Sequence, residues 1–377
     1  MLTFDTDLPA DSLEFCPQVG FEDIFVCGTY KLVDSDRRSN PKVEGDAVVI
    51  SESKNTVQGP QTRKGQCLLF RITKNPEDEF RQIQRFNLPA ILDMKWGHRS
   101  GAVPPILAIA DSEGSITVHE WREQSMTQID SIRCATSDTL VLSIDWSNRR
   151  RQDASPGTLI ASLSNGSLCI LTSTETGSMA ITNTWHAHDH EPWVAAWNYW
   201  NTNIIYSGKS LLWRGDDLKL KAWDVRQGFE SPAFVNKRFD AGVTSIQSHP
   251  YIEHLLAVGS YDNTVKLFDT RKLSTVMTEA DVGGGAWRIK WCPSFERKSD
   301  LLVASMHDGF KVMRFGSNNE NSDWSSFSGA SEIVNRNDEH ESMAYGADWC
   351  YGGQLANGKS IVGGCSFYDH KIYIWSA

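Results

Sequence analysis

VTSIQSHPYIEHLLAVGSYDNTVKLFDTR, residues 243–271, decides the fold of this chain. VTSIQ and TVKLFD alternate apolar with polar residues and HLLAVGS is an apolar run, so the stretch predicts three short β-strands. His249-Pro250 ends the first strand, because proline cannot donate a hydrogen bond to a ladder. Tyr261-Asp262-Asn263 predicts the tight turn after the second strand, since Asp and Asn side chains can bond backbone amides there.

A six-residue alternating signature, usually ending in Trp, recurs along the chain. Its copies are DSLEFC ending at Cys16, ILDMKW at Trp96, VLSIDW at Trp146, WVAAWN at Asn198, VTSIQS at Ser248, AWRIKW at Trp291 and AYGADW at Trp349. Where no long loop intervenes, the spacing approaches the roughly 40–45 residues of a WD40 blade. Seven copies predict an all-β, seven-bladed WD40-type β-propeller that spans residues 1–377 as a single domain.

The first residues of the chain are expected to close this ring. LTFDTD, residues 2–7, alternates but has no strands of its own to pair with, and an open ring would leave unpaired edges. We therefore predict that it forms the outer strand of blade seven. Polar stretches at about 34–64, 148–156 and 316–341 predict inserted loops, either plain or acting as docking arms for a partner. KSLLWR, residues 209–214, interrupts blade four.

Composition limits the partners and the location. Lys and Arg total 37 against 47 Asp and Glu, a net charge of -10, which argues against a nucleic-acid or anionic-membrane partner and suits a cationic ligand. The eight cysteines include no CxxC pair and are interpreted as free thiols of a reducing compartment. No signal peptide and no apolar span of roughly 18 residues is evident. We expect a cytoplasmic monomer.

In a propeller, the starts of the innermost strands and the turns between second and third strands converge on one rim. The strand starts supply Trp193, Trp287, Arg288 and Tyr345. The turns supply Tyr206, Ser207, Ser260, Tyr261, Met306, His307, Phe367 and Tyr368. Aromatic side chains grouped on one surface indicate a binding site, and ring faces beside carboxylates favour a cation.

Many of these residues also have a structural interpretation. Asp262, Asp308 and Asp369 stand where Asp braces a turn, and Trp96, Trp146, Trp291 and Trp349 are spaced as packing residues between sheets. For Trp193, Trp287 and Tyr345, packing and binding both remain open. HAHDHE, residues 186–191, could present three imidazoles to zinc, but a structural or catalytic His188 is favoured. We expect no metal and no cofactor.

Several motifs resemble a known family over nearly the whole chain, from Thr6 to Trp375. They are TDLPADSLEFCP, AILDMKW, WHAHDHEPWVAAWNYW, GVTSIQSHPYIEHLLAVGSYD, GGGAWRIKW, SMHDGFKV, YGADW and CSFYDHKIYIW. They resemble the diphthine methyl ester hydrolases, WD40 proteins of diphthamide biosynthesis. The resemblance implies a carboxylic ester hydrolase that removes the methyl ester from methylated diphthine on translation elongation factor 2. The alternative is a non-catalytic WD40 adaptor that binds elongation factor 2 or scaffolds a complex.

The resemblance also implies a set of site residues. His188, Glu191 and Trp193 match the loop that enters blade four, and the remaining matches are Ser260, Tyr261, Trp287, Arg288, His307 and Cys365 to His370. In one route His188 or His307 activates water, Glu191 orients the imidazole and Arg288 steadies the oxyanion. In the other, Ser260 or Cys365 attacks the ester. The expected substrate-binding residues are Trp193, Tyr261, Trp287, Tyr345 and Tyr368.

Overall fold

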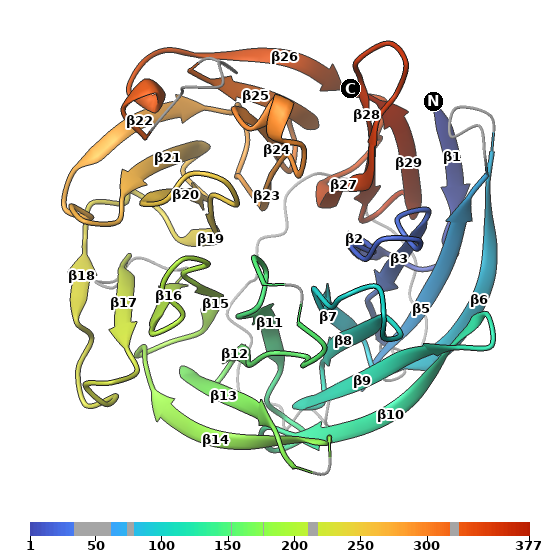
Figure 1. The fold of residues 1–377 in the computed structure, drawn as a ribbon, viewed down its shortest axis with the longest axis horizontal. Coiled ribbons are helices and arrows are strands. Elements are labelled where there is room, and N and C mark those ends of the chain that lie inside the picture. The colour runs from blue at the N-terminus through green and yellow to red at the C-terminus, as the bar shows by residue number, and fades with distance from the viewer. Residues whose placement is uncertain (34–61, 74–78, 152, 176, 210–217, 317–323) are drawn as a thin grey trace, which may run out of the picture.

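Seven β-sheets stand around a central channel in the computed structural model, which describes residues 1–33, 62–73, 79–151, 153–175, 177–209, 218–316 and 324–377. Figure 1 looks along the channel, with one sheet, or blade, in each sector of the ring. The predicted seven-bladed propeller is therefore confirmed.

Each blade runs from an inner strand beside the channel to an outer strand at the periphery (Figure 1). The inner strands are β2 (Ala10–Phe15), β7 (Ile91–Trp96), β11 (Val141–Trp146), β15 (Pro192–Trp197), β19 (Val243–Ser248), β23 (Arg288–Trp291) and β27 (Ala344–Gln354). The second strands are β3 (Ile24–Thr29), β8 (Ile106–Asp111), β12 (Leu159–Leu163), β16 (Ile204–Lys209), β20 (Leu255–Ser260), β24 (Asp300–Ala304) and β28 (Ser360–Ser366).

Beyond the second strand, each blade continues with a third strand that is largely buried and an outer strand that is more exposed. The third strands are β5 (Thr62–Ile72), β9 (Ser115–Arg122), β13 (Ser167–Ser173), β17 (Leu220–Asp224), β21 (Thr264–Asp269), β25 (Phe310–Phe315) and β29 (Lys371–Ser376). The outer strands are β6 (Phe80–Leu88), β10 (Ser125–Arg133), β14 (Met179–His186), β18 (Phe234–Asn236), β22 (Val276–Asp281), β26 (Ser331–Asn337) and β1 (Leu2–Asp5). A short strand, β4 (Lys31–Val33), pairs with β5.

The N-terminal strand closes the ring as predicted. β1 pairs antiparallel with β29, so blade seven contains both ends of the chain (Figure 1). This pairing supplies the outer edge of the last blade with a partner strand. The helices of the described residues are the 3₁₀ turns η1 (Phe295–Arg297) and η2 (Trp324–Phe327). None of the described helices has the length and apolar character needed to cross a membrane.

The signature tryptophans link neighbouring blades. Trp96, Trp146 and Trp349 are at most 2% exposed, and each lies at or near the end of the regular part of an inner strand. The indole Nε1 of each donates to a carbonyl oxygen on the preceding inner strand, at 3.2, 3.0 and 2.8 Å respectively. The apolar rings thus fill the space between sheets while their polar atom is satisfied, which is why this residue type recurs at this position in most blades.

Three details differ from the sequence analysis. The signature copies ending at Cys16 and Asn198 were placed one residue late, because β2 and β15 end at Phe15 and Trp197. β26 lies within the stretch 316–341 that was predicted as a polar loop, and residues 62–64 belong to β5. Lys209 ends β16, whereas the rest of KSLLWR and residues 34–61 lie outside the described residues.

Candidate functional site

A continuous row of aromatic rings crosses the end of the channel where the inner strands begin, here called the aromatic mouth. In order the rings are Tyr261, Trp193, Trp287, Tyr345, Phe367 and Tyr368. Neighbouring ring centroids are separated by 6.1, 5.2, 4.9, 4.9 and 4.9 Å. Tyr261 and Tyr368 at the two ends of the row are 42% and 63% exposed.

A shared backbone irregularity places these rings. The ladder skips one residue between Pro192 and Val194 in β15 and between Ala344 and Gly346 in β27. The skipped residues are Trp193 and Tyr345, and a bulged residue is unpaired and re-aimed relative to its strand. The same skip occurs in β2, where the residue at this position is Asp11. The aromatic mouth therefore includes a carboxyl group beside its rings.

Asp11 is partly exposed and its charge depends on its neighbours. Burial raises the pKa of Asp11 to about 7, while Arg288 lowers it and Asp93 raises it further. Arg288 itself pairs with Asp93, with Nη2 lying 3.2 Å from Oδ1. The floor of the aromatic mouth consequently holds one carboxyl that changes charge near neutral pH and one cation that is already paired.

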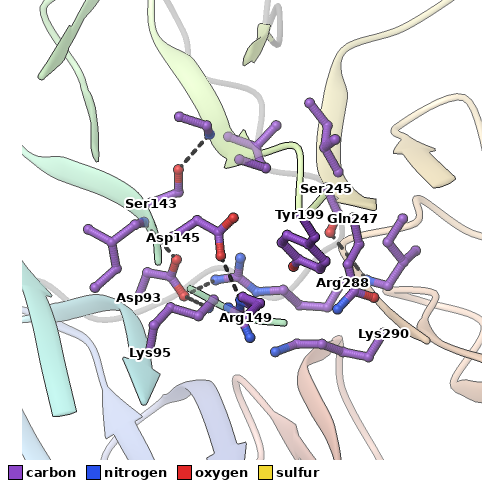
Figure 2. Close-up of a pocket in the computed structure, with 16 residues that line it drawn as sticks. Asp93, Lys95, Ser143, Asp145, Arg149, Tyr199, Ser245, Gln247, Arg288 and Lys290 are labelled. Carbon is purple, nitrogen blue, oxygen red and sulfur yellow. Dashed lines mark hydrogen bonds and ion pairs between the residues drawn. The ribbon is translucent and has the colours of Figure 1, made fainter. Parts of the chain in front are cut away.

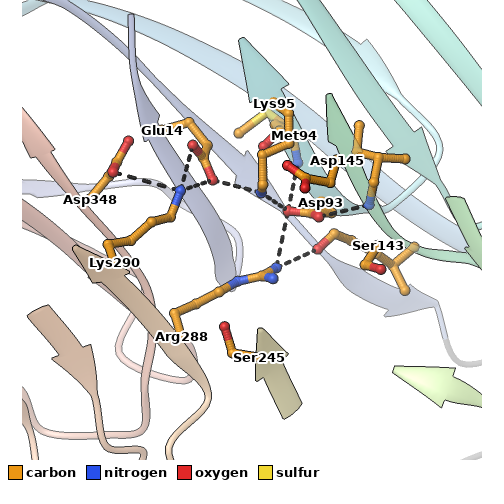
Figure 3. Close-up of polar contacts among 12 residues, drawn as sticks. Glu14, Asp93, Met94, Lys95, Ser143, Asp145, Ser245, Arg288, Lys290 and Asp348 are labelled. Carbon is orange, nitrogen blue, oxygen red and sulfur yellow. Dashed lines mark hydrogen bonds and ion pairs between the residues drawn. The ribbon is translucent and has the colours of Figure 1, made fainter. Parts of the chain in front are cut away.

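Below this floor, buried charges pair with one another across the channel. Lys290 Nζ lies 2.7 Å from Glu14 Oε1 and 3.6 Å from Asp348 Oδ1, and Lys95 Nζ lies 2.7 Å from the same Glu14 oxygen (Figure 3). Beside these charges, Asp93, Arg288 and Lys290 line a cavity of about 30 Å³, room for no more than a few water molecules.

The polar inner-strand residues also join the blades, a role that the sequence analysis missed. Asp93 Oδ2 accepts from the backbone N–H of Ile144 at 3.0 Å, and Asp145 Oδ2 accepts from that of Trp197 at 2.9 Å. These acceptors satisfy backbone donors that face the channel and have no further strand to bond. The signal was present in ILDMKW and VLSIDW, where polar residues occupy alternate positions of an otherwise buried strand.

Two of the predicted catalytic residues lie inside blades. His188 is 1% exposed and its Nε2 lies 2.8 Å from Ser207 Oγ, which also accepts from Trp223 Nε1 at 2.9 Å. This arrangement matches the structural alternative for His188. Ser260 is fully buried at the end of β20, and Cys365, the other suggested nucleophile, is fully buried in β28. All three side chains are buried and are not open to solvent at the aromatic mouth.

The other predicted residues lie nearer the surface. Glu191 is exposed in the loop before β15. His307 is exposed and lines a cavity of about 550 Å³ together with Tyr368, so the structure brings these two together. Arg288 lies in the channel below the rings. No group of three or more His, Cys, Asp or Glu side chains within the described ranges is arranged to hold a metal ion.

Comparison with known proteins identifies long matches. The chain is 37% identical over 355 residues to "Diphthine methyltransferase" of Mus musculus, covering 92% of this chain and 68% of the relative. It is 36% identical to the protein of that name in Homo sapiens, covering 93% and 74%. It is 33% identical to "Diphthine methyltransferase homolog" of Dictyostelium discoideum, covering 98% and 96%. No protein-family model matches the chain.

The structural comparison supports the fold alone. A chain of the "Crystal Structure of Mitotic Checkpoint Complex" superposes with a TM-score of 0.66 at 12% sequence identity, covering 100% of this chain and 93% of the other. An identity this low carries no information about the site, because the same propeller fold hosts unrelated functions.

The names of the relatives correct the activity expected from the sequence. A methyltransferase transfers a methyl group, whereas the sequence analysis predicted an ester hydrolase that removes one. The predicted carboxylic ester hydrolase activity is therefore wrong, and the hydrolytic roles suggested for His188, Glu191, His307, Arg288 and Ser260 no longer apply. The resemblance rested on motifs spread through the fold, and such motifs do not specify the direction of a reaction.

Proposed function

Since this chain belongs to the diphthine methyltransferase family of WD40-repeat proteins, we propose that it acts on the diphthine side chain of translation elongation factor 2 in a methyl-transfer step of diphthamide biosynthesis. The observation that carries the proposal is the row of rings from Tyr261 to Tyr368 across the aromatic mouth. Trp193, Tyr261, Trp287, Tyr345 and Tyr368 are the proposed substrate-binding residues.

The chemistry of diphthine suits this surface. Its side chain carries a trimethylammonium group, which cannot donate a hydrogen bond and is attracted to the negative face of an aromatic ring. Each such contact is worth roughly 0.5–2 kcal/mol, depending on how far the ring and cation are desolvated. The ionised Asp11 adds attraction, and the positive charge of Arg288 is offset by its pairing with Asp93.

Methyl transfer also needs a methyl donor and an acceptor atom. A donor of the sulfonium class carries a positive charge, and the partly exposed faces of Tyr261 and Tyr368 suit it for the same reason that they suit the substrate. The quaternary nitrogen of diphthine has no lone pair, so the acceptor would be an oxygen of its carboxylate: the C–O bond forms as the C–S bond breaks, and the donor leaves as a neutral thioether.

The test is a methyl count with purified components. Elongation factor 2 that carries diphthine is incubated with this protein alone, with or without a sulfonium methyl donor, and the modified peptide is analysed by mass spectrometry. We expect a gain of one methyl group that requires both the donor and the protein. An unchanged mass would mean that the protein does not catalyse methyl transfer, and loss of a methyl group would mean that it removes one. Either result contradicts the proposal.

Asp11→Asn tests the contribution of the carboxyl group. In the wild type we expect affinity for diphthine-bearing elongation factor 2 to rise about three- to fourfold from pH 6 to pH 8, because the raised pKa of Asp11 lies at about 7 and its ionised form adds on the order of 1 kcal/mol of attraction. The variant should lose this rise. The titratable groups that act on Asp11 or are acted on by it are Arg288, Asp93, Tyr345 and Cys27.

The same carboxyl should affect stability in the opposite direction. Its pKa in the folded protein is above the unfolded value of 3.8, so the folded state holds the proton more tightly. Stability is thus lost as pH rises from about 4 to about 7. We expect the difference in free energy of unfolding between Asp11→Asn and the wild type to shift in favour of the variant from pH 4 to pH 8, as measured by urea unfolding. The same difference at both pH values would contradict a raised pKa for Asp11.

A further inference from the structure

A second cavity lies at the opposite end of the channel from the aromatic mouth, where the inner strands end. Its volume is about 330 Å³, at the lower end of the roughly 300–1,000 Å³ typical of ligand pockets. The lining residues that matter here are His98, Arg149, Arg150, Tyr199, Tyr251 and Tyr351, and we call it the basic cavity. About 20 Å of inner strand separates it from the rings, since a six-residue strand rises roughly 3.3 Å per residue.

The lining of the basic cavity is positively charged. Arg149 and Arg150 remain protonated at any physiological pH, and no carboxylate is among its described lining residues. Burial lowers the pKa of His98 well below its ordinary value, with Arg149 and Lys290 adding to the shift, so this imidazole is neutral. In a chain with a net charge of -10, two arginines in a lining that is otherwise neutral form an unusual local charge, even though Arg149 is paired with Asp145.

Arg149 is a largely buried cation. Its side chain is only 7% exposed, and Nε donates to Asp145 Oδ1 at 2.9 Å (Figure 2). Nη1 lies 3.2 Å from His98 Nε2. Arg149 also lines the cavity, where its remaining N–H groups can donate to water or to a ligand. The basic cavity is the space from which such an acceptor can come.

The walls suit a flat ligand. Tyr199, Tyr251 and Tyr351 supply rings, and the remaining walls include prolines and Trp291. At the rim, the guanidinium carbon of Arg150 lies 3.2 Å from the ring centroid of Trp200, so the second cation is held in place by a stacked ring. Flat apolar walls together with two guanidinium groups are a combination that recognises planar anions.

We propose that the basic cavity binds a small organic anion, whose carboxylate or phosphate pairs with Arg149 and Arg150 and whose flat body packs against the tyrosine rings. The site is separate from the proposed diphthine site, because none of the rings of the aromatic mouth lines the basic cavity. The inference therefore does not depend on the activity proposed above.

Four probes test it by ligand-observed NMR titration of the full chain: phenyl phosphate, benzoate, inorganic phosphate and benzyl alcohol. We expect phenyl phosphate or benzoate to bind, and each of the other two to bind at least about tenfold more weakly. Whichever aryl anion binds identifies the head group. If neither aryl anion binds, the cavity holds water only. If benzyl alcohol binds as tightly as the aryl anions, the charge is not needed, and if inorganic phosphate does, the ring is not needed. Each of these results overturns the proposal.

A matched pair of variants locates the site. Arg150→Glu reverses a charge at the rim and should weaken binding of the aryl anion by about tenfold or more. Arg151→Glu makes the same change one residue later, on an exposed side chain that does not line the cavity, and should change the affinity by less than about twofold. Equal losses in the two variants would mean a non-specific field and would overturn the proposal.

Discussion

Lys290→Met is expected to lower the free energy of unfolding by about 3–5 kcal/mol, because it removes the cation shared by two buried carboxylates and leaves Glu14 with Lys95 alone. Lys290 Nζ lies 2.7 Å from Glu14 Oε1 and 2.8 Å from Oε2, and the side chains of Lys290, Glu14 and Asp348 are 7%, 5% and 1% exposed. Burial opposes ionisation of Glu14, but Lys290 and Lys95 outweigh it and lower its pKa. Urea unfolding at neutral pH measures the effect.

Arg226→Met is the control for a lost ion pair at the surface. Arg226 also contacts a carboxylate, with Nη2 lying 2.6 Å from Asp224 Oδ2, but its side chain is 62% exposed. Exposed pairs contribute only about 0–1 kcal/mol, so this variant should unfold almost as the wild type does. Similar losses in the two variants would show that burial of the Lys290 network is not what matters.

A second substitution tests the origin of the loss. Glu14→Gln added to Lys290→Met removes one of the two carboxylates that lost their shared cation, so the double variant should recover part of the lost stability. In the single variant, loss of the cation should raise the folded-state pKa of Glu14. The stability that the single variant has lost relative to the wild type should therefore grow as pH rises from about 4 toward neutral and shrink as pH falls. A deficit independent of pH would contradict the electrostatic explanation.

Trp287→Ala is expected to weaken binding of diphthine-bearing elongation factor 2 by about 10–100-fold. Trp287 is central in the row of rings, with centroids 5.2 Å from Trp193 and 4.9 Å from Tyr345. Its removal deletes one ring face and leaves both neighbours without the ring that orients them. Isothermal titration calorimetry with modified and unmodified elongation factor 2 separates recognition of the side chain from contacts to the rest of the protein.

Two controls accompany this variant. Trp287→Phe keeps a ring at the position and should retain most of the affinity, since a smaller aromatic face still attracts a cation. Tyr251→Ala removes an aromatic side chain that is 37% exposed in the basic cavity, at the other end of the channel, and should leave the affinity for diphthine unchanged. If Trp287→Ala weakens binding of unmodified elongation factor 2 as much as binding of the modified protein, the rings do not recognise the diphthine side chain.

The arrangement of blades explains how distant residues come to act together. Trp193, Trp287 and Tyr345 belong to or adjoin three different inner strands, and each lies at the corresponding point of its blade. A ring of equivalent strands converts a repeated position in the chain into neighbouring positions in space. No repeated position in the sequence indicates the kind of reaction. The prediction of hydrolysis failed because fold and motif spacing do not specify whether a methyl group is added or removed.

The amino-acid sequence by itself determined the number of blades, most of their strands and the closing strand. Alternation in VTSIQ and TVKLFD, and the Trp near the end of most inner strands, reflect hydrogen bonding and packing within one blade or its neighbour, which local patterns record. It predicted three strands for each blade and, apart from β1, missed the fourth, outer strands. β26 shows why: it is largely solvent-exposed, with Ile333 49% exposed, and so carries little alternation.

Only the tertiary structure decided which charges and rings meet. Glu14 and Lys290 are 276 residues apart in the chain, yet they pair across the channel. Nothing along a single strand specifies such a pairing, because its partner is set by the angle between blades and by the closure of the ring. For the same reason, the position of Arg149 in the basic cavity has no signature in the sequence and becomes visible only once the blades surround it.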